Sequence, residues 1–160
     1  QLAKVLGAGH VTAVCSSRNV ETARSLGADR VVDYSQEDFT KLDERFDLML
    51  DIAGSRPWRH VKRVLAPDAT VVLVGGPRTN RLLGPLGHVV AFRLAAIGSG
   101  RTLVFFIAKL NKADMETLRD LLASGQMRSV LDEHYPLGDL TAALNQMGEG
   151  HCQGKIVVTM

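Results

Sequence analysis

The sequence predicts an α/β fold built around a parallel sheet. The first observation is the stretch at 11–18, where a short apolar run rich in β-branched residues stops in two serines and an arginine. The second is that a helical pattern lies on each side of this run. The pattern before it is broken by glycines, and the pattern after it covers 20–26. The third is that apolar runs recur along the chain and end in polar or glycine turns. This alternation is typical of parallel sheets with crossover helices.

Local signals place the elements near the amino end. Residues 1–6 have the pattern of the last turns of a helix, and the apolar spacing at 20–26 predicts a helix that a glycine ends. Adjacent valines at 31–34 predict a second short strand. Ser35 to Asp38 has the form of a capping box in which Asp replaces the usual Glu, so a short helical segment is expected to follow it.

Two strands are expected in the middle of the chain. The mostly apolar run at 46–52 predicts a strand that is buried on both faces. Apolar residues at helical spacing from Trp58 to Leu65 predict a helix that Pro67 ends. The run at 70–74 is the clearest strand in the sequence, and a Gly-Gly-Pro turn closes it.

The carboxyl-terminal half repeats the alternation. A long apolar segment at 82–97 predicts a helix with a broken start, and 103–107 predicts a strand. Asn111, with Asp114 three residues on, predicts the cap of a helix whose buried stripe holds Met115, Leu118 and Leu121 or Leu122. The remaining expected elements are a strand at 130–135, a helix with an apolar stripe of Leu140, Ala143, Leu144 and Met147, and a strand at 155–160.

Composition narrows the class of protein. The 160 residues, 46% hydrophobic and 22% charged, suffice for a domain with a sizeable core. A net charge of +2 without a long basic run argues against nucleic acid or a membrane surface as the main partner, and no apolar run approaches the roughly 20 residues of a membrane span. Cys15 and Cys152 have no paired spacing, which favours reduced thiols and a cytoplasmic location. The five scattered histidines predict no metal site.

The polar end of the first strand predicts a nucleotide site. Ligands of parallel sheets bind beyond the carboxyl ends of the strands, where Ser16, Ser17 and Arg18 lie. An acid near this position binds the free ribose 2′-hydroxyl of NAD, whereas an arginine accommodates the 2′-phosphate of NADP. No Asp or Glu occurs from 11 to 20, and Arg18 can pair with a phosphate bidentately. The alternative is that Ser17 or Asn19 only caps the next helix and that Arg18 is a solvated charge.

Several further motifs occur in a specific order. They are residues 11–18, Ser25-Leu26-Gly27-Ala28-Asp29, Val32-Asp33-Tyr34, Phe46-Asp47 with 51–54, Leu73-Val74-Gly75-Gly76, Phe105-Phe106, and Gly150-His151 with 154–158. In this order and spacing the chain resembles the carboxyl-terminal part of a medium-chain dehydrogenase/reductase, of the zinc-independent quinone oxidoreductase branch.

The resemblance implies a Rossmann-type doubly wound parallel sheet. Family members carry a catalytic domain, a first cofactor strand and a glycine-rich phosphate loop before the part that this chain matches. We therefore expect a piece of a longer enzyme, marginally stable and inactive alone, with its sheet split where strand 1 belongs between strands 2 and 4. Residues 1–129 are expected to form a partial NADP-binding domain, and 130–160 a segment that returns to the catalytic domain.

The resemblance also assigns cofactor contacts. The 2′-phosphate falls to Ser16, Ser17 and Arg18, with Tyr34 against the same phosphate and the adenine. Backbone groups of Ile52, Ala53, Val74 and Gly75 are expected to line the ribose and nicotinamide, although Gly75 is equally explained by a tight turn. Phe105 and Phe106 are expected to contact the nicotinamide end through main chain, the alternative being that they are core residues. No catalytic residue and no metal ligand is assigned in this chain.

The implied activity is hydride transfer from NADPH to a small-molecule quinone, enone or related carbonyl. The predicted strand from Leu103 to Ile107 is expected to pair with its copy in a homodimer. Two alternatives stay open. One is an NAD(P)-dependent relative of the zinc-containing alcohol dehydrogenases, against which the missing acid after Cys15 argues. The other is a nucleotide-binding module without turnover.

Overall fold

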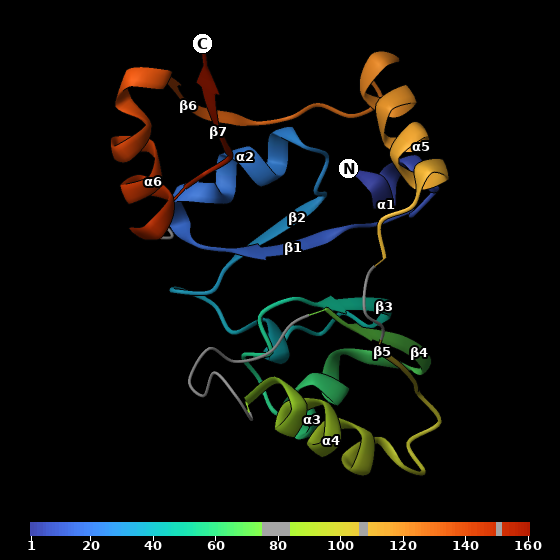
Figure 1. Ribbon diagram of the computed structural model, residues 1–160. Helices are drawn as coiled ribbons and strands as arrows, with labels where there is room; N and C mark the ends of the chain where they lie inside the picture. Colours follow the sequence, from blue (N-terminus) through green and yellow to red (C-terminus); the bar gives the residue numbers. More distant parts are fainter. Residues whose placement is uncertain (75–83, 106–108, 150–151) are drawn as a thin grey trace. The chain divides into compact units, whose positions relative to one another are not determined.

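The computed structural model describes residues 1–74, 84–105, 109–149 and 152–160 (Figure 1). Contacts within the chain divide it into two compact units, one of residues 1–37 with 110–160 and one of residues 38–109. In the described residues no helix is both long enough and apolar enough to cross a membrane. The expected division between 129 and 130 concerns a return to another domain and stays a prediction.

The first unit begins with a two-stranded parallel sheet. α1 (Leu2–Val5) leads into β1 (Thr12–Cys15), and α2 (Val20–Ser25) crosses over to β2 (Arg30–Asp33). The register pairs Thr12 with Arg30 and Cys15 with Asp33, so both strands end in the same row. A short 3-10 turn, η1 (Ser17–Asn19), joins β1 to α2. This is the helix, strand, turn and helix order that the sequence predicts.

The rest of the first unit contains a second parallel pair. α5 (Lys112–Ala123) begins as expected, because the Asn111 side chain accepts a hydrogen bond of 2.9 Å from the Asp114 amide. β6 (Leu131–Pro136) and β7 (Lys155–Thr159) run parallel, joined by η4 (Leu137–Asp139) and α6 (Leu140–Glu149) (Figure 1). Gly154 is required before β7, because a Cβ there would collide with the Val130 carbonyl.

The expected buried stripes of these two helices are only partly confirmed. On α5, Leu118 and Leu121 are half-buried, but Met115 and Leu122 are exposed. On α6, Ala143 is buried, whereas three other members of its stripe are exposed: Leu140, Leu144 and Met147. The amphipathic spacing is correct, but within the described residues no element covers the outer part of either stripe.

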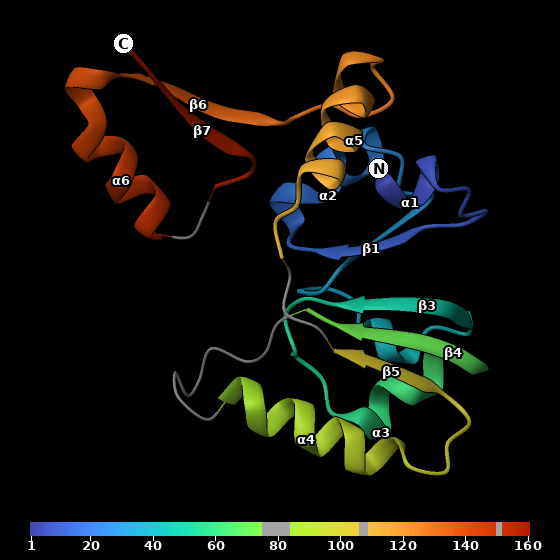
Figure 2. The same cartoon turned by 45° about the vertical axis from the view of Figure 1, so that its right-hand side comes forward.

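The second unit is a three-stranded parallel sheet that helices cover on one face (Figure 2). β4 (Leu65–Leu73) lies between β3 (Phe46–Asp51) and β5 (Thr102–Phe105). α3 (Trp58–Val61) and α4 (Gly84–Ala96) cover one face (Figure 2). The core joins alternate β4 residues to both helices, and the Trp58 and Phe92 rings meet edge to face with centroids 5.6 Å apart. η2 (Phe39–Lys41) precedes β3, and η3 (Lys62–Val64) follows α3.

Three expectations for this unit are corrected. The predicted helix from Trp58 to Leu65 ends early, because Leu65 already begins β4 and Pro67 lies inside that strand. The register shifts near Phe46, and proline is tolerated in a strand at such an irregularity. Ser35 is not a helix cap; Asp38 is, because its Oδ1 accepts the Thr40 amide.

The third correction concerns β3, which is not buried on both faces. Leu48 and Leu50 are 56% and 57% exposed. The helices of this unit cover only the opposite face, on which Met49 packs against the core. The pattern of a doubly buried strand is therefore present in the sequence, but only half of that burial occurs within the described part of the chain.

The fold class is confirmed: every strand pair in the described residues is parallel, with helices between the strands. β1 and β2 form one sheet and β3, β4 and β5 another, and no ladder joins the two within the described residues. This agrees with the sheet order expected when strand 1 of a doubly wound sheet is not among the strands present.

Candidate functional site

The carboxyl ends of β1 and β2 bring together the expected phosphate-binding residues. Tyr34 follows β2, and its amide donates to the Cys15 carbonyl over 3.0 Å, so the two strand ends are joined. Ser16 is half-buried, while Ser17 and Arg18 are exposed in the turn that follows β1. Tyr34 is 59% exposed, which leaves its ring accessible to a ligand.

A hydrogen bond joins the carboxyl-terminal segment to this turn. Gln153 Nε2 donates to the Arg18 carbonyl oxygen over 3.2 Å. Gln153 is itself held by its amide, which donates to Asp132 on β6 over 2.9 Å. The turn that carries Arg18 is therefore attached to the segment before β7, although the two lie far apart in the sequence.

Asp33 is a member of this site that the sequence analysis did not assign. Its Oδ2 accepts the Ser17 hydroxyl at 2.5 Å and Gln36 Nε2 at 2.9 Å. Its Oδ1 accepts the Ser35 hydroxyl at 2.7 Å and the Ser35 amide at 3.0 Å. These donors, first of all Ser17, lower the pKa of the Asp33 carboxyl. The signal that would have found it is the parallel register, since both predicted strands end in the same row.

Cys15 is the last residue of β1 and lies opposite Asp33. Burial, and after it the charge of Asp33, raises the pKa of its thiol. The thiol is thereby held in its neutral form, as expected for an inert strand cysteine.

The second group of expected contacts lies along the carboxyl edge of the other sheet. The register aligns Asp51, Leu73 and Phe105 in one row across β3, β4 and β5. The residues that follow the first two strands, Ile52 and Val74, are 68% and 55% exposed. Phe105 is 48% exposed, which excludes a fully buried core role for this ring.

Asp51 shapes the turn after β3. It is 7% exposed, and its Oδ1 accepts the Gly54 amide over 2.8 Å. Its carbonyl accepts the Val74 amide over 2.9 Å, which ties the ends of β3 and β4 together. Gly54 has φ +59°, a backbone conformation that favours glycine. Ala53 is exposed in this turn, and the expected contacts Gly75 and Phe106 lie outside the described residues.

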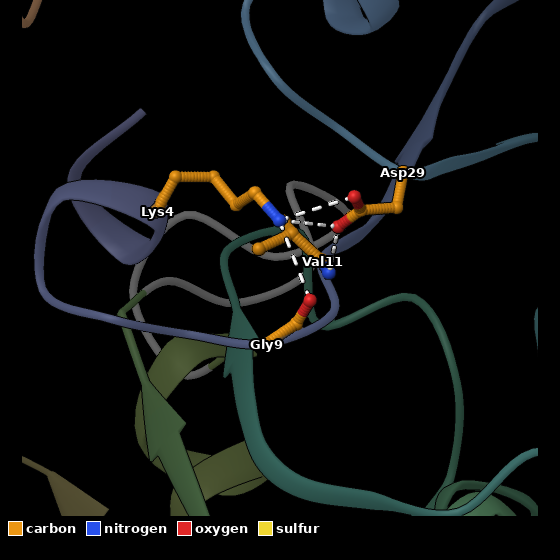
Figure 3. A network of polar contacts seen from close by, with 4 residues as sticks. All are labelled: Lys4, Gly9, Val11 and Asp29. Carbon is orange, nitrogen blue, oxygen red and sulfur yellow. Dashed lines mark hydrogen bonds and ion pairs between the residues drawn. The ribbon is translucent and has the colours of Figure 1, made fainter.

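A polar network at the opposite ends of β1 and β2 sets their register (Figure 3). Lys4 Nζ lies 2.9 Å and 3.1 Å from the two carboxylate oxygens of Asp29 and donates to the Gly9 carbonyl over 3.4 Å. The Val11 amide donates to Asp29 Oδ2 over 2.7 Å. The Lys4 hydrogen bond and then that of Val11 lower the pKa of the Asp29 carboxyl. Because the strand starts are fixed here, their ends meet at the site.

The residues of each unit, taken separately, fit part of a nucleotide cofactor in character. Beyond β1, a guanidinium and hydroxyl groups suit a phosphate, and the exposed Tyr34 ring offers a face to a base. Beyond β3 and β4, exposed apolar side chains at Ile52 and Val74 suit a flat ring. Asp33 is the one group of the first cluster whose charge opposes a phosphate. Among the described residues, no three or more His, Cys, Asp or Glu side chains gather as metal ligands.

Comparison with known proteins identifies relatives of this chain. The family model for zinc-binding dehydrogenases matches residues 26–158. The chain is 31% identical to the chloroplastic quinone-oxidoreductase QR1 of Triphysaria versicolor, over 99% of this chain and 47% of that protein. It is 29% identical to the chloroplastic NADPH-dependent alkenal/one oxidoreductase of Arabidopsis thaliana, over 99% of this chain and 36% of that protein.

A solved structure supports the same fold. The quinone oxidoreductase from Coxiella burnetii superimposes with a TM-score of 0.77 at 21% identity, over 99% of this chain and 47% of that one. The chain thus spans about half the length of the curated relatives it matches.

Proposed function

Because the chain belongs to the zinc-binding dehydrogenase family, we propose that it binds NADPH within an oxidoreductase that transfers hydride to a quinone, an enone or a related carbonyl. The observation that carries the proposal is Arg18, exposed in the turn directly after β1, where an NAD-specific sheet carries an acid. The resemblance to quinone and alkenal oxidoreductases supports the substrate class. NADPH is also named for one of these relatives.

The first cluster of residues is proposed to hold the adenosine end. Arg18 offers a bidentate partner for a 2′-phosphate, with Ser16 and Ser17 beside it. Tyr34 offers its exposed ring to the adenine and its hydroxyl to the phosphate. A guanidinium is favoured here over a carboxylate because an acid in this turn would repel the phosphate.

The second group of residues is proposed to hold the ribose and nicotinamide end. Backbone groups of Ile52, Ala53, Val74 and Gly75 are proposed to line it, with Phe105 and Phe106 contacting the ring through main chain. NADPH supplies a hydride when bound. The chain's own contribution is to bind and orient, and we assign no catalytic residue within these 160 residues.

The test is the binding of NADPH and NADH to the full chain by isothermal titration calorimetry, with an Arg18→Gln variant. We expect NADPH to bind more tightly than NADH, and Arg18→Gln to weaken NADPH about tenfold or more while leaving NADH within about twofold, since a hydrogen-bonded charge pair is lost only with the phosphate. Arg119→Gln, an exposed arginine on α5, is the matched control and should change neither constant. Equal loss of both cofactors in Arg18→Gln would reject the phosphate role.

Two other functions can be distinguished from the proposed one by binding and activity measurements. An NAD-dependent alcohol dehydrogenase relative would bind NADH in preference, and Asp33 is the observation that favours it. A module without turnover would bind the cofactor, but the whole enzyme would not oxidise NADPH in the presence of a quinone or an enone.

The proposal of a homodimer rests on one edge strand, and that of a cytoplasmic location on the two cysteines. β5 is an edge strand of its sheet in the described residues, so a second copy of the chain could pair along 103–107. A monomeric mass by light scattering would reject this pairing. A cytoplasmic location stays a prediction from the two unpaired cysteines.

A further inference from the structure

The Asp33 carboxylate accepts hydrogen bonds from two serine hydroxyls, those of Ser17 and Ser35. A serine hydroxyl has a single proton to donate, and an ionised carboxylate can only accept. Ser17 therefore gives its proton to Asp33 Oδ2, and Ser35 gives its proton to Asp33 Oδ1. The two hydroxyl oxygens lie 3.2 Å apart, but neither has a second proton with which to bond the other. The hydroxyl protons of Ser17 and Ser35 are thus both donated to the Asp33 carboxylate.

The Ser17–Asp33 pair lies where a 2′-phosphate is proposed to bind. Ser17 directly precedes Arg18 in the exposed turn, and Asp33 directly precedes Tyr34. An anion that accepted the Ser17 hydroxyl would sit beside the Asp33 carboxylate, because Ser17 Oγ lies only 2.5 Å from it. To bind there, the anion would have to replace Asp33 as the acceptor of the Ser17 hydroxyl. The negative charge of Asp33 would also repel it.

Two other acids lie near the pair, and each is in an ion pair. A surface hollow of about 400 Å³ opens beside the pair, and Ser17 and Asp33 both line it. Its lining includes two further carboxylates, Glu21 and Glu37, which form ion pairs with Arg24 and Arg30, respectively. The low pKa of Asp33 means that its own charge persists at neutral pH.

We infer that Asp33 determines cofactor specificity: it withholds the Ser17 hydroxyl from a 2′-phosphate and limits the preference that Arg18 gives to NADPH. The inference rests on the proposed function, because it concerns the same nucleotide site. Arg18 favours the phosphorylated nucleotide and Asp33 opposes it, so the chain retains binding of the unphosphorylated one.

The test isolates the 2′-phosphate by titrating adenosine 2′,5′-bisphosphate and adenosine 5′-monophosphate against the full chain and taking the ratio of their dissociation constants. Asp33→Asn should raise the preference for the bisphosphate about tenfold and leave the monophosphate within about twofold, since it removes a charge at contact distance. The remaining amide oxygen is a weaker acceptor than the carboxylate and competes less with a phosphate. Asp68→Asn, which removes an exposed acid on β4 that neither lines this hollow nor contacts Ser17, should change the ratio less than about twofold.

Ser17→Ala provides the second arm, and its measurement in the unaltered chain does not depend on how the Asp33 variant folds. In the unaltered chain the Ser17 proton is held by Asp33, so Ser17→Ala should change the ratio less than about twofold. In the Asp33→Asn background the freed hydroxyl bonds the phosphate, so the same change should lower the ratio about tenfold. Circular dichroism of each variant checks that the chain is folded.

The outcomes separate this inference from the proposed function. A ratio unchanged or lowered in Asp33→Asn, an equal rise in Asp68→Asn, or a tenfold loss in Ser17→Ala alone overturns the role of Asp33 while the nucleotide site stands. If the unaltered chain binds neither nucleotide, the proposed function fails and the inference fails with it.

Discussion

At the scale of single residues, two carboxylates, Asp33 and Asp29, hold the opposite ends of β1 and β2 together. Asp33 follows Ser17 by sixteen positions, and the parallel register alone brings their side chains into contact. Asp29 acts at the other end of the same strands, where it holds Lys4 and the Val11 amide. Both carboxyls are kept ionised by donors around them, Asp33 mainly by Ser17 and Asp29 mainly by Lys4. Asp29 therefore holds the starts of the two strands, and Asp33 sets the charge at their ends.

The Asp29 network predicts an acid-dependent loss of stability. Its folded pKa lies below the 3.8 of the unfolded chain, so its stabilising contribution is complete above that pH and is lost as the pH falls through the folded value. The melting temperature should therefore exceed that of Asp29→Asn by a constant margin from neutral pH to about pH 5, and the margin should shrink below about pH 4.

Comparing melting curves of the two chains at each pH removes the contributions of the other carboxyls, which both chains share. Asp47→Asn, at an exposed position on β3, serves as the matched control and should show no such pH-dependent margin. A margin that stayed constant down to pH 2 would contradict the assigned role of Asp29.

At the scale of elements, the sheet of the second unit is organised by β4. Ala69, Val71 and Leu73 alternate along the strand on the face that α3 and α4 cover, and each is at most 1% exposed. Phe92 closes this core from α4 and is 2% exposed. The core fixes the ends of β3, β4 and β5 in one row, and the proposed nicotinamide contacts follow that row.

Phe92→Ala should destabilise the chain by about 3–5 kcal/mol, because it removes a buried ring and leaves a cavity against Trp58. Leu94→Ala on the same helix is the matched control: that side chain is 65% exposed, and its removal should cost no more than about 0.5 kcal/mol. Urea denaturation of the three chains measures both values. Similar losses in the two variants would mean that α4 does not pack as described.

Most of the elements could be predicted from the sequence, because their signals are local. The Asn111 cap and the strand at 70–74 rest on neighbouring residues and are confirmed. Pro67 misled the prediction, because a proline that ends a helix and one that sits at a strand irregularity look alike in the sequence. The prediction that β3 is buried on both faces was wrong for another reason. Leu48 is exposed because the apolar pattern shows which residues can be buried, but not which element would cover them.

The candidate site was predictable to the same extent. Ser17 and Arg18 could be proposed because they directly follow a strand, and Tyr34 because it follows the next one. Asp33 could not, because its contact with Ser17 depends on the register between two strands rather than on any local pattern. Asp33 changes the chemistry expected of the turn after β1. That turn contains no acid in the sequence, but the folded chain places the Asp33 carboxylate against it.

At the scale of the whole molecule, the chain presents parallel strands whose edges are open in the described residues. β1–β2 and β3–β4–β5 follow the two halves of a doubly wound sheet, and apolar side chains at Val14, Leu48 and Leu50 are exposed. Unpaired edges and exposed apolar residues lower stability and favour association. We therefore expect a low melting temperature for the chain without ligand, and a clear response to any ligand that binds only the folded state.

The most direct test of the account is thermal unfolding of the 160-residue chain alone, with NADPH, and with NADH at the same concentration. NADPH at about 100 times its dissociation constant should add about 2.7 kcal/mol to the folded state and raise the midpoint, with a smaller rise for NADH. That result would support both the cofactor assignment and the part played by Arg18. A cooperative transition that neither cofactor shifts, or that NADH shifts more than NADPH, would contradict the central claim.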